Sequence, residues 1–433
     1  MSLSRYREYK DSGQEWLAEV PQHWNVKRVK RLVSSIEQGW SPQCENFAVD
    51  GEDEWGVLKV GCVNGGVFNP LENKKLPSEL RAIPELGIAQ GDLLISRANT
   101  RELVGSAAVA TKDYRNLLLC DKLYRLRLQS EQCTPHFLSC YLSIEEVRGQ
   151  IELAATGASS SMLNIGQSVI LELPVPLPPL KEQLAIAAFL DRETSKIDTL
   201  IAEQEKLLAL LAKKRQATIS HAVTRGLNPD VPMKGSGVAW LGEVPAHWEL
   251  KALKRAVVLQ RGHDLPAEER IEGDIPVVSS GGVSGRHNVA ITTGPTIVTG
   301  RYGTIGEFTL VKANCWPLNT ALYAVQMFNN SPEYLWYMLQ SLKEIFVLNS
   351  MKSAVPGVDR NDIHPLTICL PPLEEQFDIV AFLDAETSKL DRLKAGAEHA
   401  MELLKERRSA LISAAVTGKI DVREQQSALE AAA

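Results

Sequence analysis

The chain has 433 residues, enough for about three domains, and its 44% hydrophobic and 23% charged residues are typical of a globular protein and exclude a disordered one. The formal net charge of −6 gives no compositional sign of a nucleic-acid binder. No apolar run approaches the roughly eighteen residues of a membrane span and the N-terminus is polar, so a cytoplasmic protein without a membrane partner is expected.

The seven cysteines are odd in number and include no CxxC pair. This pattern indicates reduced, mostly buried thiols and predicts neither a disulfide framework nor a bound metal.

The first element in chain order is a segment that occurs twice. Residues 10–24, KDSGQEWLAEVPQHW, and residues 234–248, KGSGVAWLGEVPAHW, are identical at 10 of 15 positions with an offset of 224. We name them the first and second strap. Their tryptophans and aliphatic side chains are interpreted as packing residues, and the pattern is that of a tandem duplication.

The first insert, residues 25–172, predicts a compact α/β module of short strands with glycine-bounded turns, followed by one helix over residues 135–151. Its polar turns are candidates for reading bases, because arginine pairs bidentately with guanine and asparagine with adenine. The alternative, that these are ordinary turns and that the basic patch is a solvated helix face, stays open. The candidates are Arg97, Asn99, Arg101, Ser160 and Asn164 in turns, and Lys27 and Lys30 in a patch after the first strap.

A long helix is predicted after the first insert and again near the C-terminus. Residues 177–224 and 370–417 match at 28 of 48 positions with an offset of 193, and prolines stand only at the start of each segment. Leucines at seven-residue spacing (Leu190, Leu211, Leu383, Leu390, Leu404, Leu411, with Ile197) predict an apolar seam. Leu200, Leu207, Leu393 and Ala400, three residues further on, are expected to complete it, and each helix is expected to pair with the other.

The second insert, residues 249–366, repeats the order of strands and turns of the first and predicts the same fold, with one helix over residues 332–346. Arg301 and Tyr302 lie in the turn that corresponds to the one holding Arg97, and Thr304 follows in the same loop. Lys251 and Lys254 repeat the basic patch after the second strap. These five residues complete the set of DNA-binding candidates.

No catalytic motif is present. The chain lacks a GxxxxGK[ST] phosphate loop, and it lacks the Asn/Asp-Pro-Pro-aromatic signature with which adenine methyltransferases hold a flipped base. No catalytic residue is therefore assigned, and no cofactor of its own is expected.

The two straps, together with LPPLKEQLAIAAFLDRETSKID and LPPLEEQFDIVAFLDAETSKLD, resemble the specificity subunit of type I restriction–modification systems over essentially the whole chain. The resemblance implies a prokaryotic, non-catalytic subunit whose two inserts are target recognition domains, each reading half of a bipartite double-stranded DNA target. It also implies antiparallel helices that set the spacer between the half-sites. S-adenosylmethionine, ATP and magnesium are then expected on partners, namely two modification subunits and one restriction subunit.

The predicted fold class is α+β: two α/β recognition domains joined by two long helices that form an antiparallel coiled coil, in a pseudo-two-fold tandem repeat. The predicted divisions are recognition domain 1 at 1–172, helical spacer 1 at 173–233, recognition domain 2 at 234–366 and helical spacer 2 at 367–433. Two alternatives stay open: a related system in which nuclease and methylase are fused in one partner, and a coiled-coil adaptor that binds protein or sugar. The recognised bases and the spacer length do not follow from the sequence.

Overall fold

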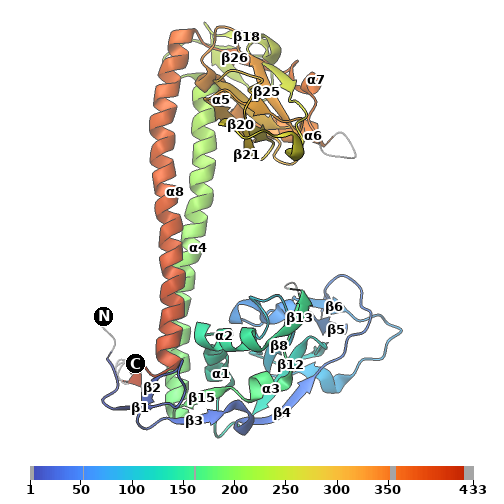
Figure 1. The fold of residues 1–433 in the computed structure, drawn as a ribbon, viewed down its shortest axis with the longest axis vertical. Coiled ribbons are helices and arrows are strands. Elements are labelled where there is room, and N and C mark those ends of the chain that lie inside the picture. Colours follow the sequence, from blue (N-terminus) through green and yellow to red (C-terminus); the bar gives the residue numbers. More distant parts are fainter. Residues whose placement is uncertain (1–3, 52, 160–161, 352–356, 424–433) are drawn as a thin grey trace. The chain divides into compact units, whose positions relative to one another are not determined.

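A computed structural model describes residues 4–51, 53–159, 162–351 and 357–423. It divides into two compact units, one formed by residues 1–202 and 401–433 and the other by residues 203–400. Each unit holds one insert, one strap and a segment of each long helix (Figure 1). None of the helices in the described residues is long and apolar enough to cross a membrane. The four-part domain division stays a prediction.

The first insert is built on two four-stranded sheets in unit 1. One is fully antiparallel, with the order β10-β8-β12-β4, and its residues contribute to the largest core of the unit. The other has the order β6-β5-β11-β7 and a parallel pair, β5 with β11. The strands are β4 (Val33–Gln38), β5 (Gly56–Leu58), β6 (Asn73–Lys75), β7 (Gly87–Ile88), β8 (Leu93–Ser96), β10 (Ala107–Val109), β11 (Tyr114–Leu118) and β12 (Leu123–Leu128).

The second insert, in unit 2, repeats this topology, except that its second sheet has three strands where that of the first insert has four. Its antiparallel sheet has the order β19-β25-β22-β23, and its second sheet, β21-β20-β24, again contains one parallel pair, β20 with β24. The prediction that the two inserts share a fold is confirmed. The strands are β19 (Val258–Arg261), β20 (Ile275–Ser279), β21 (Gly282–His287), β22 (Thr296–Gly300), β23 (Phe308–Val311), β24 (Trp316–Pro317) and β25 (Ala321–Gln326).

One glycine in each insert shows how closely the copies correspond. Gly39 directly follows β4, and a Cβ added there would lie 2.0 Å from the carbonyl oxygen of Leu119. Gly262 directly follows β19, and its Cβ would lie 2.1 Å from the carbonyl oxygen of Leu318. At each of these glycines the backbone passes so close to a neighbouring backbone that no side chain fits, so glycine is required at both positions.

Each insert ends in helices that are shorter than predicted. The helix expected over residues 135–151 is two, α1 (Pro135–Leu142) and α2 (Glu145–Ala154), because Ile144 between them has an extended backbone. The helix expected over residues 332–346 is also two, α5 (Pro332–Ser341) and α6 (Lys343–Ser350). The single-helix predictions were wrong because neither break carries a proline or glycine; the side chains of Leu142, Ile144 and Leu342 are buried instead, so packing turns the chain.

Apart from the two long helices, the remaining strands and α-helices are short. In unit 1 they are β1 (Tyr9–Asp11), β2 (Glu19–Pro21), β3 (Asn25–Arg28), β9 (Ala98–Asn99), β13 (Thr156–Ser159), β14 (Met162–Asn164), α3 (Gln167–Leu171) and β15 (Pro174–Leu177). In unit 2 they are β16 (Met233–Gly235), β17 (Glu243–Pro245), β18 (Glu249–Ala252), α7 (Arg360–Ile363) and β26 (Thr367–Leu370). β3 pairs with β15 and β18 with β26, which joins the two ends of each insert.

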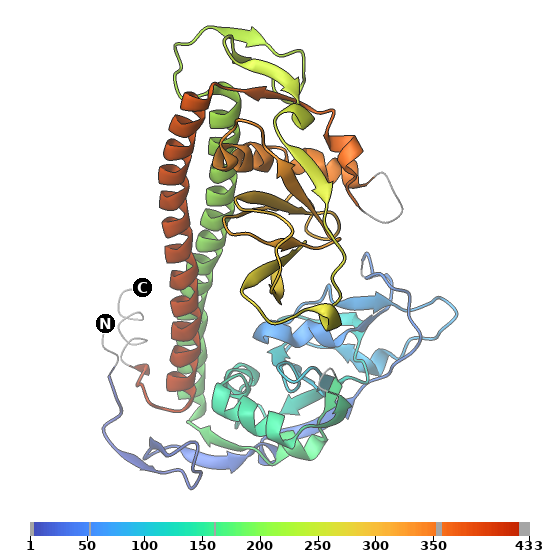
Figure 2. The ribbon, with the colours of Figure 1, turned by 45° about the horizontal axis from the view of Figure 1, so that its top comes forward.

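The two long helices are α4 (Leu180–Arg225) and α8 (Leu373–Val416), and in each unit a segment of one lies against a segment of the other (Figures 1 and 2). In unit 1, Ile186 near the start of α4 shares a core with Ile412 near the end of α8. In unit 2, Val223 near the end of α4 shares a core with Ile379 near the start of α8. The pairing is therefore antiparallel, as predicted.

The predicted seam is correct in one row and wrong in the other. Leu190, Ile197, Leu383, Leu390 and Ala397 are buried, which confirms the seven-residue row. Of the residues three positions further on, Leu200, Leu207 and Leu393 face solvent, with exposures of 50%, 40% and 58%, and Ala400 is half-buried. The seam instead uses positions four residues on, where Thr387 is buried and Thr194, Ile201, Leu208 and Met401 are half-buried. Apolar residues occupy both rows, so the sequence alone did not distinguish them.

A carboxylate at the start of each long helix binds the strap of its unit. Glu182 Oε1 accepts from the indole Nε1 of Trp24 at 3.1 Å, and its Oε2 accepts from His23 Nε2 at 2.8 Å. Glu375 makes the same two contacts, at 3.1 Å with Trp248 and at 2.8 Å with His247. Trp24 and Trp248 are buried, which confirms that they are packing residues.

The next residue on each helix holds the insert itself. The side-chain oxygen of Gln183 accepts from the backbone N–H of Thr134, and that of Gln376 accepts from the N–H of Ser331, both at 2.9 Å. Thr134 and Ser331 are the N-caps of α1 and α5. Both glutamines are buried, so adjacent Glu and Gln side chains fix strap and insert to the helix in each unit.

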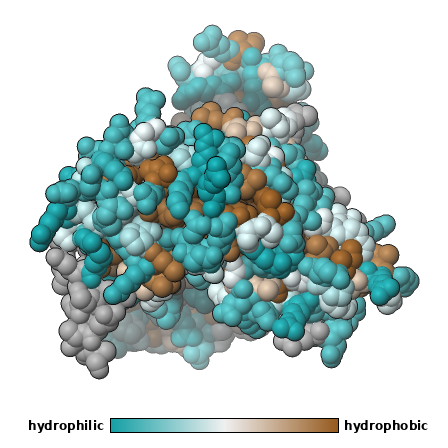
Figure 3. All heavy atoms as spheres, turned by 90° about the horizontal axis from the view of Figure 1, so that it is seen from below, coloured by the Kyte–Doolittle hydropathy of each residue, from teal (hydrophilic) through white to brown (hydrophobic). Residues whose placement is uncertain are grey.

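The face of the molecule that is drawn in Figure 3 is predominantly polar, and apolar side chains form scattered groups between the hydrophilic ones. Among the larger exposed apolar side chains, three on α4 and α8 occur as a matched set in each unit: Leu184, Leu200 and Leu403 in unit 1, and Phe377, Leu393 and Leu210 in unit 2. Each pair of counterparts is separated by the helix-repeat offset of 193 residues.

Candidate DNA interface

Arg97 and Arg301 occupy the same place in the two inserts. Arg97 follows β8; its backbone N–H donates to Lys122 at 2.8 Å, and its carbonyl accepts from Ile165 at 3.0 Å. Arg301 follows β22; its N–H donates to Thr320 at 2.9 Å, and its carbonyl accepts from Val358 at 3.0 Å. The predicted correspondence of these two turns is confirmed by their backbone contacts.

The candidates near Arg97 differ in how free their side chains are. Arg97 donates to the carbonyl of Asp121 at 3.1 Å, and Asn99, which is buried, donates to Asn64 at 3.3 Å. Arg101 is exposed and forms an ion pair with Glu152 at 2.9 Å. Asn164, in β14, pairs through its backbone with Ala98, so it lies beside Asn99. Ser160 lies outside the described residues.

The candidates after β22 form an exposed loop. The guanidinium carbon of Arg301 lies 4.9 Å from the centre of the Tyr302 ring, a stacking contact that orients both side chains. Tyr302 is 38% exposed. Thr304 is exposed, and its hydroxyl donates to the carbonyl of Ser280. The loop thus presents a planar cation, an aromatic ring and a hydroxyl from one short segment.

Three of the four candidate lysines already have partners in their own unit. Lys27 donates to Gln132 at 2.9 Å, Lys30 donates to Glu172 at 2.8 Å, and Lys251 lies 2.5 Å from Glu249. Lys30 and Lys251 thus have their charges balanced by carboxylates, whereas Lys27 contacts a neutral amide and Lys254 is exposed.

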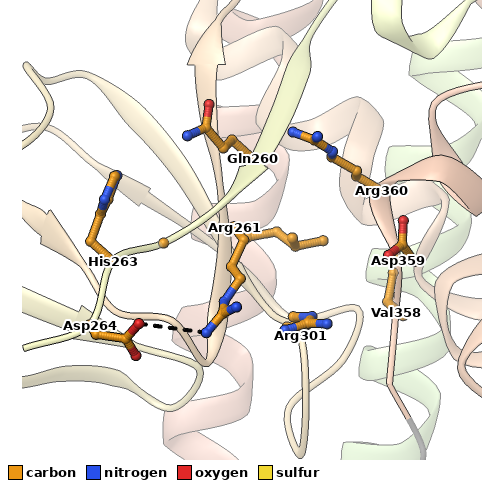
Figure 4. A pocket seen from close by; sticks show the side chains of 10 residues that line it. Gln260, Arg261, His263, Asp264, Arg301, Val358, Asp359 and Arg360 are labelled. Atoms are coloured by element: carbon orange, nitrogen blue, oxygen red, sulfur yellow. Dashed lines mark ion pairs between the residues drawn. The ribbon is translucent and has the colours of Figure 1, made fainter.

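A polar cavity of about 460 Å³ adjoins Arg301 in unit 2 (Figure 4). Its walls come from the end of β19, the turn after β22, strand β25 and the start of α7. They are formed by Gln260, Arg261, Gly262, His263, Asp264, Arg301, Leu322, Val358, Asp359 and Arg360. Sequence reasoning found Arg301 but missed Arg261 and Arg360. The available signal was the glycine that follows the matched strand in each insert, because it aligns Arg261 with Gln38.

Most polar groups around this cavity are fixed by neighbours. Arg261 and Asp264 form an ion pair at 3.7 Å, drawn as the dashed line in Figure 4. His263 lies 3.1 Å from the hydroxyl of Tyr323, and Asp359 accepts from the backbone N–H of Asn361 at 2.7 Å. The walls therefore carry three guanidinium groups and two carboxylates, so both donors and acceptors are available.

A histidine close to this cavity is held neutral. His364 Nε2 accepts from the backbone N–H of Leu259 in β19 at 3.0 Å, so that nitrogen carries no proton. Burial lowers the pKa of His364, and the positive charges of Arg360 and Lys254 lower it further, against an opposing effect of Asp359. This hydrogen bond holds β19, the strand that carries Arg261, and it requires that His364 Nε2 stays unprotonated. In the described part of the chain no group of three or more His, Cys, Asp or Glu side chains is arranged to hold a metal ion.

Comparison with known proteins identifies the family. The sequence model of the type I restriction modification DNA specificity domain matches residues 21–209 and 245–400. Two matches to one such domain cover most of the chain, and the chain belongs to this family: it is a type I restriction–modification specificity subunit.

Individual relatives agree. The chain is 30% identical over 173 residues to the type I restriction enzyme EcoEI specificity subunit of Escherichia coli, a match that covers 40% of this chain and 29% of that protein. It is 23% identical over 430 residues to a Methanocaldococcus jannaschii protein provisionally named as the type I restriction enzyme MjaX specificity subunit, covering 94% of this chain and 96% of that one. A solved chain from a study of complex assembly in the type I R-M system has a TM-score of 0.70 at 17% identity, covering 92% of this chain and 98% of that one, and so has the same fold.

Proposed function

We propose that each insert reads one half of a bipartite double-stranded DNA target and that the paired helices set the unspecified spacer between the halves. One observation carries this proposal: two inserts with matching strand order in their antiparallel sheets, fixed to the helices by the same Gln contacts, present different side chains at matched positions. Identical frames with different exposed residues suit one geometry that recognises two different sequences.

The DNA-contacting residues are proposed from the two matched turns. Arg97, Asn99, Arg101, Ser160 and Asn164 serve the first half-site, and Arg301, Tyr302 and Thr304 serve the second. Lys27, Lys30, Lys251 and Lys254 contact phosphates beside the straps. Arginine and asparagine supply the bidentate donors that base edges require, and the lysines supply the salt-dependent attraction of the backbone.

The proposed partners are two modification subunits and one restriction subunit. The exposed apolar side chains of α4 and α8 support two equal partners, because the same set of three occurs once in each unit. Exposed leucines on helices are typical of protein interfaces. In this proposal the chain is a cytoplasmic subunit that catalyses neither methylation nor cleavage, and S-adenosylmethionine, ATP and magnesium act on the partners.

The test is methylome sequencing of the source cell with and without this gene. A single bipartite adenine-methylated sequence should disappear on deletion and return on complementation. The purified chain alone, given DNA, S-adenosylmethionine, ATP and magnesium, should leave the DNA unchanged. Methyl incorporation that copurifies with this chain would show that it is an enzyme after all, and an unchanged methylome would show that it specifies no methylated target.

A further inference from the structure

The cavity beside Arg301 gathers three arginines from segments far apart in the sequence. Arg261 ends β19, Arg301 follows β22, and Arg360 begins α7 (Figure 4). Among these, only Arg301 belongs to the turn that both inserts share. At the other two positions the backbone contacts match between the inserts, but the residue types differ.

The first insert has glutamines where the second has these two arginines. Gly39 and Gly262 make the same close approach after matched strands, so Gln38 corresponds to Arg261. Ile165 and Val358 donate to the carbonyls of the matched Arg97 and Arg301, so two residues further on Gln167 corresponds to Arg360. At these three matched positions the first insert therefore carries one cationic side chain, that of Arg97, and the second insert carries three.

The cavity also contains two carboxylates, and one of them, Asp264, pairs with Arg261. Asp264 lies 3.7 Å from Arg261 and accepts from Asn319 on its other side. A site built only for a phosphate gains nothing from a carboxylate, because the two negative charges repel. The major-groove edge of a G·C pair has both characters: O6 and N7 of guanine accept, and N4 of cytosine donates. An arginine beside an aspartate matches that edge.

We propose that this cavity reads a G·C base pair in the major groove of the half-site assigned to the second insert. Arg261 donates to O6 and N7 of guanine, and Asp264 accepts from N4 of the paired cytosine. Arg261 and Asp264 are therefore specificity-determining residues. This inference rests on the proposed function, since it takes duplex DNA as the ligand of the insert.

The experiment uses the chain in complex with its modification subunits, after the wild-type methylome has defined the target. Duplexes are made in which each guanine of the second half-site is replaced in turn by 7-deazaguanine, which lacks the N7 acceptor. Wild-type complex should lose about tenfold in affinity at one position, within the range of a single base contact. The Arg261→Gln complex should bind the normal and the modified duplex at that position equally well, and its methylome should relax at that pair alone.

Two further variants make the result decisive. Asp264→Ala changes an exposed side chain, so it should fold normally, and it should relax the same base pair. Arg286→Gln removes an equal charge from a partly exposed arginine of the same insert, outside the cavity, and should leave the methylated sequence unchanged.

Two outcomes would overturn the inference. If Arg261→Gln weakens binding to all duplexes alike and lowers the salt slope by about one, Arg261 contacts a phosphate. If neither Arg261→Gln nor Asp264→Ala alters any position, the cavity reads no base. Failure of the proposed function is distinguishable, because then the wild-type complex itself would specify no bipartite target.

Discussion

Arg408 of α8 donates to Asp198 of α4 at 2.9 Å, and the same contact exists with the helices exchanged: Arg215 of α4 donates to Asp391 of α8 at 2.8 Å. Both members of the second pair are displaced from their counterparts by the repeat offset of 193 residues. In each unit one helix supplies the arginine and the other the aspartate. Such exchange is the signature of a two-fold relation between two like elements.

Each of these two ion pairs is expected to make a similar, small contribution to the free energy of unfolding. Both are partly exposed, with Asp198 51% and Asp391 59% exposed, and such pairs stabilise by about 0.2–1 kcal/mol. Asp198→Asn and Asp391→Asn should each lower the free energy of unfolding within that range, as measured by urea titration. Glu205→Gln, an exposed change elsewhere on α4, is the control. A loss of several kcal/mol from either variant would show that the pair is a main determinant of helix association.

The carboxylate that binds the strap is expected to matter more in unit 1 than in unit 2. Glu182 is 6% exposed and also accepts from the hydroxyl of Tyr6 at 2.5 Å, whereas Glu375 is 29% exposed. Burial and this hydrogen bond raise the pKa of Tyr6 well above its usual range. Removing Glu182 leaves buried donors unpaired, at a cost of about 1–3 kcal/mol each.

Glu182→Ala should therefore lower the urea midpoint more than Glu375→Ala. Glu182→Gln, which keeps one acceptor oxygen, should fall between wild type and Glu182→Ala. Equal losses from the two alanine variants would contradict the role assigned to burial.

The two matched arginines are expected to act on separate half-sites. Arg97→Ala should relax discrimination in one half-site and Arg301→Ala in the other, each by about 1–3 kcal/mol if the contact is to a base. Binding is measured on duplexes changed in one half-site at a time. If Arg301→Ala impaired both halves equally, its role would be fold stability or general phosphate contact.

The length of the paired helices is expected to set the spacer. Four helix-forming residues inserted after Leu211 lengthen α4 by about 6 Å and add slightly more than one turn, which keeps the seam nearly in phase. DNA rises about 3.4 Å per base pair, so the preferred spacer should change by one or two base pairs while both half-sites stay the same. Methylome sequencing reads the spacer directly. An unchanged spacer in an active, folded variant would show that the helices hold the complex together without measuring it.

The neutral state of His364 predicts an acid-sensitive second insert. Because its pKa is lowered on folding, the unfolded chain binds more protons below the ordinary value of 6.5. The stability it contributes is present above that pH and is lost as the pH falls from there through the lowered pKa of the folded state. Acidification from about pH 7.5 to 5.5 should lower the urea midpoint of the wild type more than that of His364→Gln, whose amide oxygen still accepts from Leu259. Equal decreases would rule out this histidine as the cause.

The sequence by itself determined the duplication, the two long helices, the common fold of the inserts and the equivalence of the Arg97 and Arg301 turns, whereas the antiparallel pairing of the helices was expected only from the family resemblance. These features depend on local signals: proline placement, glycine-bounded turns and apolar spacing, all of which act over a few residues. The buried row Leu190, Ile197, Leu383 and Leu390 followed from its period for the same reason.

Only the tertiary structure decided which apolar row of each helix is buried, where α1 and α5 end, and which lysines are already paired. It also decided that Arg261 and Arg360 share a cavity with Arg301. The physical reason is the same in each case: these outcomes depend on contacts between residues far apart in the chain, and neither helical period nor residue type specifies which distant partner a side chain meets.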